Sequence, residues 1–331
     1  MKMHRILYSS TTAVFEKYFS KIQQNYKSDI MNDLTKMVMR IRADKCPDYK
    51  SYAGYVQCII DYFDLILRLK MEGFKKFIKD HLSYCTIDLS STKWFIPRET
   101  DEIYSKSFYE TILDIMRYTD IRKKEYAEAI NEIGIRTCVY CNTEYMPIYK
   151  SKGKIKTRFE ADHFFPKNKH PFLCITFYNL LPICSYCNKT KSKYHSIFYL
   201  YTDDFKKISP FQFSLEDQSI LEYKRNFDAN KLKICIKCNE KKLLKNHNDR
   251  FHIENLYSSF KNEAEEILWK AMTRNRSYME QLKASYSYIF GAFDVDQIRF
   301  LYGFYGKKSD IHKRPLTKMK QDIAKQLKIL K

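Results

Sequence analysis

Glycine and proline are scarce in this chain, with 7 and 8 occurrences among 331 residues. So little of either argues against long flexible linkers and low-complexity tracts. No run approaches the roughly 18 apolar residues that a membrane-spanning helix needs. The first residues, Met1 to Arg5, are not followed by the apolar core of a secretory signal peptide. These absences predict a well-packed cytoplasmic protein that does not enter the membrane.

Acidic residues are also few relative to basic ones, at 39 Asp and Glu against 59 Lys and Arg. The formal net charge is +20, and the pI is about 9.3. A field of this sign attracts polyanions. Nucleic acid is therefore the expected partner, with an anionic membrane surface as the alternative.

Aromatic residues are abundant, with 27 Tyr and 23 Phe, and they supply the bulk for a sizeable core. Apolar residues recur at helical spacing in six segments: 28–43, 56–80, 108–116, 126–133, 255–272 and 316–330. Gly134 follows the fourth segment, at the position where glycine commonly ends a helix. The pattern predicts a mostly helical α+β fold, with a helical N-terminal region over residues 1–133.

The middle of the chain has a different pattern, which predicts a small core over residues 134–200. In chain order it comprises a strand over 144–149, a turn at 150–153, a second strand over 154–162, a loop over 164–182 and a helix over 185–193. Gly153 lies in the turn, where a positive φ is useful. Residues 201–331 are expected to be mixed and then helical, and to bind nucleic acid or a partner.

Four of the ten cysteines form two Cys-x-x-Cys pairs that bracket this core. They are Cys138, Cys141, Cys184 and Cys187. Zn²⁺ takes four thiolates in a tetrahedron, and each such pair supplies two of them from one side. The pairs predict a structural zinc site, because a complete thiolate shell leaves no open position for catalysis.

A third pair, Cys235 and Cys238, lies where apolar residues and lysines alternate as in a strand. Residues three apart on a strand face opposite sides, so these two thiols cannot chelate one ion. We expect a structural or incidental role for them. Nearby Lys241, Lys242 and Lys245 make this segment a candidate nucleic-acid surface.

Between the paired cysteines lie groups suited to phosphodiester hydrolysis. Asp162 and Asn188 offer hard oxygen ligands for Mg²⁺ or Mn²⁺, and the His163 imidazole can take a proton near neutral pH. Such an ion would bind the scissile phosphate and the departing 3′ oxygen while the base deprotonates water on the opposite side. Asp162 and His163 can face ion and water separately if a strand ends there, since adjacent strand residues point to opposite sides.

Four strings carry a resemblance to a known family. They are Cys-Val-Tyr-Cys-Asn at 138–142, Asp-His-Phe-Phe-Pro-Lys at 162–167, Tyr-Asn-Leu-Leu-Pro at 178–182 and Cys-Ser-Tyr-Cys-Asn-Lys at 184–189. Over residues 134–195 the chain resembles HNH endonucleases with a ββα-metal core. The resemblance implies that His163 is the general base, that Asp162 and Asn188 bind the catalytic ion, and that Asn179 braces the loop by hydrogen bonding to backbone.

The chain departs from the family at one position, because many members have histidine where this chain has Asn188. His195 is the second choice for that ligand, but seven helical residues would carry it roughly 10 Å along the axis. Glu160 shares a strand face with Asp162 and is either a supporting carboxylate or the partner of a lysine. Further basic residues in or near the motif are candidates for contact with DNA phosphates: Lys167, Lys169, His170 and Lys191.

A wider likeness concerns bacterial HNH proteins that share the Asp-His-Phe-x-Pro-Lys string and the segment Arg314-Pro315-Leu316. Several resemble nuclease effectors of phage-defence systems such as Septu and certain retrons, which implies an antiviral role beside an ATPase partner. Two alternatives stay open. One is a non-catalytic, zinc-stabilised nucleic-acid-binding module, and the other is an HNH-type ribonuclease, because net charge does not distinguish DNA from RNA.

Overall fold

The structure is a computed structural model that describes residues 4–83, 85–94, 106–192, 198–274, 276–286, 288 and 297–330. It is mostly helical, and the strands of the described residues form four two-stranded sheets. The predicted α+β class, dominated by helix, is confirmed. Within the described ranges, no helix combines the length and apolar character that a membrane crossing requires.

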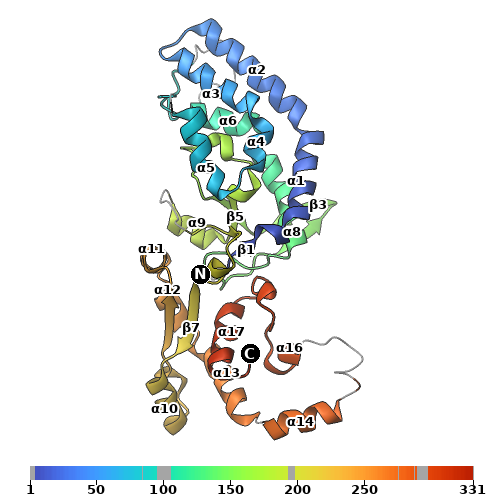
Figure 1. The fold of residues 1–331 in the computed structure, drawn as a ribbon, viewed down its shortest axis with the longest axis vertical. Helices are drawn as coiled ribbons and strands as arrows, with labels where there is room; N and C mark the ends of the chain where they lie inside the picture. Colours follow the sequence, from blue (N-terminus) through green and yellow to red (C-terminus); the bar gives the residue numbers. More distant parts are fainter. Residues whose placement is uncertain are drawn as a thin grey trace.

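Helices make up most of the N-terminal region, which lies in the upper part of Figure 1. They are α1 (Thr12–Asn25), α2 (Lys27–Asp44), α3 (Tyr49–Asp61), α4 (Phe63–Arg68), α5 (Met71–Phe77), α6 (Phe108–Ile115), α7 (Tyr118–Ile121) and α8 (Ala127–Ile133). Segment 56–80, predicted from one apolar stripe, is divided among α3, α4 and α5, because the backbone turns at Tyr62 and is extended at Leu69 and Lys70.

Two small sheets form the centre of the molecule. The hairpin pairs β2 (Ile148–Ser151) with β3 (Lys154–Thr157), and Gly153 in its turn has a φ of 72°. The second sheet pairs β4 (Glu160–His163) with β5 (Leu180–Ile183) antiparallel. Helix α9 (Ser185–Lys191) follows β5, so that β4, β5 and α9 form a ββα unit.

Three details of this region differ from the predictions. The strand predicted over 144–149 is β2 at Ile148–Ser151, so the predicted turn over 150–153 is reduced to Lys152 and Gly153. The predicted strand 154–162 is two strands, since the chain leaves its hairpin partner at Arg158 and Phe159 and pairs with β5 instead. The segment predicted as a loop over 164–182 ends in β5. All four residues of β5 are buried, so the segment lacks the alternation that marks a half-exposed strand.

The remaining elements follow residue 200, and those labelled in Figure 1 lie from its middle downward. They are β6 (Tyr201–Thr202), β7 (Phe211–Leu215), α10 (Asp217–Asn226), β8 (Ile234–Cys238), α11 (Lys241–Phe251), α12 (Ile253–Ser258), α13 (Lys261–Thr273), α14 (Arg276–Ser285), α16 (Gln297–Tyr302) and α17 (Thr317–Gln326). Strand β7 pairs with β8, and α17 packs against β7 and α13. The predicted helix over 255–272 is divided between α12 and α13.

The N-terminal segment is joined to distant parts of the chain. Strand β1 (Ile6–Leu7) pairs in parallel with β6. The neighbouring Arg5 is fully buried, its guanidinium lies 2.8 Å from a Glu240 carboxylate oxygen, and it stacks over the Tyr199 ring at 4.2 Å. Contacts therefore cross both predicted region boundaries, at 133/134 and 200/201, and the boundaries themselves stay predictions.

Candidate metal centre and nuclease site

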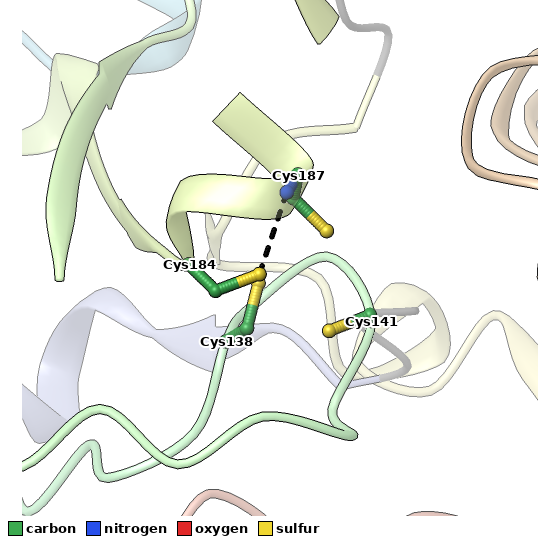
Figure 2. Close-up of side chains that lie close together, drawn as sticks. All are labelled: Cys138, Cys141, Cys184 and Cys187. Carbon is green, nitrogen blue, oxygen red and sulfur yellow. Dashed lines mark hydrogen bonds between the residues drawn. The ribbon is translucent and has the colours of Figure 1, made fainter. Parts of the chain in front are cut away.

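The four cysteines of the two predicted pairs form one buried cluster. Their sulfur atoms all lie within 4.8 Å of one another. A tetrahedral shell with Zn–S bonds of about 2.3 Å needs sulfur separations of roughly 3.8 Å, so a small contraction suffices. Figure 2 shows Cys138 and Cys141 on a loop, with Cys184 and Cys187 at the start of α9 above it. Among the described residues this cluster is the one group with the composition of a metal site.

Backbone geometry places both pairs. The Cys187 N–H donates to Cys184 Sγ at 3.4 Å, which is the bond drawn in Figure 2, and the Thr143 N–H donates to Cys141 Sγ at 3.5 Å. Asn142 turns the first loop with a φ of 54°, a left-handed conformation that asparagine tolerates. The Val139 N–H donates to the Pro182 carbonyl at 3.3 Å, which ties this loop to β5.

The four thiols also shift one another's pKa values, in a way that favours a bound cation. Hydrogen bonds from Cys138 and its neighbours lower the pKa of Cys141, while the same crowding raises the pKa of Cys187. Four sulfurs at this spacing cannot all become thiolates without a positive charge among them. A zinc ion supplies that charge, so these residues fit a structural Zn²⁺.

The ββα unit brings the predicted nuclease residues to one pocket. Strand β4 ends at His163, as the alternating orientation of Asp162 and His163 requires. Both side chains are buried, and together with Asn188 of α9 they line a pocket of about 270 Å³. The pocket wall also includes Arg122 and Tyr118 from the N-terminal helices.

His163 is held in one orientation by backbone. Its Nε2 lies 3.0 Å from the carbonyl oxygen of Cys174. A carbonyl only accepts hydrogen bonds, so Nε2 carries the proton and Nδ1 keeps a lone pair. Burial lowers the pKa of His163 to about 3, helped by the nearby cations Lys167 and Lys191. The ring is therefore neutral at physiological pH, with a free lone pair on Nδ1.

Both oxygens of the Asp162 carboxylate accept a hydrogen bond. Oδ2 accepts a hydrogen bond from the Tyr140 hydroxyl at 2.7 Å, and Oδ1 accepts one from Lys191 Nζ at 2.5 Å. Lys191 also donates to the His163 carbonyl at 3.2 Å. The position of Lys191 differs from the expectation of a surface lysine beside DNA: its side chain is buried, because the carboxylate compensates the cost of burying the ammonium.

Asn188 faces the pocket beside a second carboxylate. Its Nδ2 donates to Glu160, which therefore partners Asn188 and not a lysine. Glu160, Asp162 and Asn188 thus line the same pocket, and each carries a side-chain oxygen of the kind that Mg²⁺ or Mn²⁺ prefers. An ion at Asp162 would share the carboxylate with the Lys191 ammonium or displace it.

Asn179 is completely buried and makes three hydrogen bonds to the loop after β4. Its Oδ1 accepts from the Phe165 N–H at 2.8 Å, and its Nδ2 donates to the carbonyls of Phe165 and Leu173 at 3.2 and 3.1 Å. These contacts hold the loop that ends in Cys174, whose carbonyl positions His163. Asn179 thus acts on the site through backbone and does not line the pocket.

The other basic candidates divide between the pocket and its surroundings. Lys167 lines the pocket, with Nζ 4.9 Å from the Tyr118 ring centre. His170 is half-buried against Phe165 and does not line it. His195 lies outside the described residues. Lys169 is exposed and outside the pocket wall.

Two residues of the site, Tyr140 and Arg122, were not predicted from the sequence. Tyr140 lies inside the first Cys-x-x-Cys pair, and its contact with Asp162 depends on the packing of this loop against the sheet of β4 and β5. Arg122 belongs to a π-helical turn at Arg122–Tyr126, far from the motif in sequence. The position of Tyr140 between two cysteines of the predicted zinc site is a sequence feature that points to this residue. No sequence feature points to Arg122.

The third cysteine pair lies in β8, as predicted, and its two side chains are half-buried. Within the described part of the chain, neither Cys235 nor Cys238 joins a cluster of possible metal ligands. The Cys238 Sγ accepts a hydrogen bond from the Glu240 N–H at 3.3 Å, at the turn before α11. This contact fits a structural role.

Comparisons of this chain with models of protein families, with curated proteins and with solved structures gave no match.

The free energy of unfolding should decrease as the pH is lowered, because the buried side chains of His163 and His247 are neutral in the fold. Burial lowers the pKa of both His163 and His247 to about 3. An unfolded chain takes up a proton at each near pH 6.5, so the folded state loses about 1.4 kcal/mol per histidine between about pH 7.5 and 5.5. Urea unfolding in the presence of zinc measures this loss, and His247→Gln should remove about half of it. A free energy of unfolding that is equal at the two pH values would contradict the expectation.

Proposed function

We propose that this chain is a metal-dependent HNH-type endonuclease that hydrolyses phosphodiester bonds of DNA. The observation that carries the proposal is the meeting of Asp162, His163 and Asn188 in one pocket of a ββα unit whose helix begins in a four-cysteine cluster. The motif strings and the positive net charge support it. A pure zinc-ribbon binder has no chemical need for a neutral, oriented imidazole next to a buried carboxylate.

In the proposed reaction, His163 Nδ1 accepts a proton from a water molecule. The water oxygen then bonds to phosphorus, and the bond from phosphorus to the 3′ oxygen breaks, which leaves a 5′-phosphate and, after protonation, a 3′-hydroxyl. A Mg²⁺ or Mn²⁺ ion held through Asp162 and Asn188 would supply positive charge to the phosphate and the departing oxygen. The Cys174 carbonyl keeps the imidazole in the tautomer that this step needs.

The cationic wall of the pocket has a part in the same scheme. Arg122, Lys167 and Lys191 all line it; Arg122 and Lys167 provide positive charge for a phosphate, whereas Lys191 is paired with Asp162. They also lower the pKa of His163 when no anion is present. An entering phosphate offsets their charge, raises the pKa of His163 and so makes the ring a stronger base once substrate is bound.

One specific observation supports the alternative, a non-catalytic nucleic-acid-binding module. Both oxygens of Asp162 are already engaged, by Tyr140 and by the buried Lys191 ammonium. A binder that had lost its catalytic ion would hold its carboxylate in this way. An RNA substrate keeps the same site chemistry and is separated from DNA by the assay below. The antiviral role and an ATPase partner are proposals that rest on the resemblance of short strings alone.

Cleavage should require an added divalent ion that is distinct from the resident zinc. We expect the purified protein to keep about one zinc per chain and to nick plasmid DNA only when Mg²⁺ or Mn²⁺ is supplied. The measurement is gel analysis of plasmid, single-stranded DNA and total RNA with Mn²⁺, Mg²⁺ or EDTA, beside zinc content by mass spectrometry. Binding without cleavage of any substrate would favour the non-catalytic module, and cleavage in EDTA would contradict the role of the second ion.

A further inference from the structure

The outward face of the β2–β3 hairpin carries aromatic and basic side chains and no acid. Residues 145–159 contain five basic residues and neither Asp nor Glu. We call the outward-facing residues Tyr149, Lys154 and Lys156, together with the adjoining Arg158, the basic ribbon. All four are exposed, and none of the three cations forms an ion pair with a described residue.

The pairing register puts Tyr149, Lys154 and Lys156 on one side, and Arg158 follows directly after the end of β3. Tyr149 lies directly opposite Lys156, and Ser151 opposite Lys154. Successive strand residues alternate between faces, so Lys154 and Lys156 share the outward face and stand roughly 7 Å apart. Ile148 and Ile155 point the other way and pack against the core. The hairpin is thus fixed from behind, by contacts of β3 with α8 and with the turn at Arg122–Tyr126, and presents a stiff basic face to solvent.

The basic ribbon runs into the nuclease pocket. Glu160, which lines the pocket, follows Arg158 by two residues, a span of roughly 7 Å along an extended chain. The turn that supports β3 contributes Arg122 to the same pocket. A strand of phosphates lying along the hairpin would therefore lead toward His163.

We propose that the basic ribbon binds the phosphate backbone of nucleic acid and guides it into the pocket, an inference that rests on the proposed function. Positive side chains without acidic neighbours suit phosphates. The exposed Tyr149 ring offers a base a stacking surface, which favours single-stranded or locally unpaired nucleic acid. An anionic membrane is the weaker partner, because no aliphatic side chain on this face is among the exposed large apolar residues.

The test uses binding without cleavage. The background is His163→Ala, without divalent ions, and the ribbon variant adds Lys154→Gln, Lys156→Gln and Arg158→Gln. The probes are single-stranded and duplex DNA of about 30 nucleotides, followed by fluorescence anisotropy across a salt series. We expect the ribbon variant to bind at least about tenfold more weakly at about 100 mM salt and to lose about 2 to 3 from the slope of log K against log salt. Tyr149→Ala should weaken single-stranded binding more than duplex binding.

A matched control removes the same charge elsewhere. Lys75, Lys76 and Lys79 are exposed on and just after α5, away from β3 in Figure 1, and their replacement with glutamine should change affinity by less than about twofold. Equal losses in both variants, or none in the ribbon variant, would overturn the proposal. So would a ribbon variant that loses binding to vesicles of phosphatidylserine and keeps binding to DNA. A failure of the proposed nuclease function gives a different result from a failure of this inference. In that case the parent chain would cut no substrate, while its binding to nucleic acid would still depend on the basic ribbon.

Discussion

Replacing His163 with alanine should lower the cleavage rate by about a thousandfold or more while nucleic-acid binding and zinc content stay unchanged. General-base catalysis contributes about 10² to 10⁴ in rate, and no other imidazole lines this pocket among the described residues. Single-turnover cleavage of plasmid DNA with Mn²⁺ measures the loss, and anisotropy measures binding.

Loss of the base must be separated from loss of structure. Alanine leaves the Cys174 carbonyl without its hydrogen bond, which can cost about 1 to 3 kcal/mol. His163→Gln restores an N–H donor and does not restore a base, so it should be equally inactive and closer to the parent in melting temperature. His170→Ala changes a histidine outside the pocket and should keep activity within about tenfold. A cleavage rate that persists in both His163 variants would remove the assignment of His163 as the base.

Replacing Cys184 with serine should release zinc and unfold much of the molecule. Structural zinc binding in small peptides is worth about 10 to 16 kcal/mol, comparable to the whole stability of a typical domain at about 5 to 15 kcal/mol. The loop bearing Cys138 and Cys141 is joined through the cluster to α9, and Tyr140 of that loop binds Asp162. The expected result is loss of bound zinc, a much lower melting temperature and no cleavage.

The matched control for this experiment is Cys235→Ser. Cys235 is half-buried in β8 and belongs to no ligand cluster of the described residues, so serine should leave zinc content and activity unchanged. A Cys184→Ser protein with normal zinc content and melting temperature would contradict the cluster as a metal site. If Cys235→Ser lost zinc, the third pair would have to be reassigned.

Local patterns predicted much of this fold. Glycine conformation determines the end of the helix at Gly134 and the turn at Gly153. Ligand spacing determines the paired cysteines and the short helix after Cys184. Each of these features depends on only a few neighbouring residues. Strand β5 was not predicted, and the reason lies in its tertiary packing. It is covered on both faces, so burial removes the alternation on which strand prediction depends.

The contacts of the site likewise divide into those that local sequence predicts and those that depend on tertiary packing. The meeting of Asp162, His163 and Asn188 at one pocket follows from the strand and the helix that carry them. The burial of Lys191 does not, because it depends on the distance between α9 and β4, which no local pattern specifies. The contact of Tyr140 with Asp162 and the presence of Arg122 in the wall likewise depend on packing between segments that are distant in sequence.

The parallel pairing of β1 with β6, together with the ion pair of Arg5 and Glu240, has a consequence for synthesis on the ribosome. The first strand of the chain emerges about two hundred residues before its partner does. All four ligand cysteines leave the exit tunnel before that partner, so zinc can be captured while the amino-terminal end is still loose. The contacts that fasten the start of the chain therefore form only after the four cysteines have been synthesised, and a nascent chain stalled before Glu240 would have its cysteine cluster without the ion pair that holds Arg5.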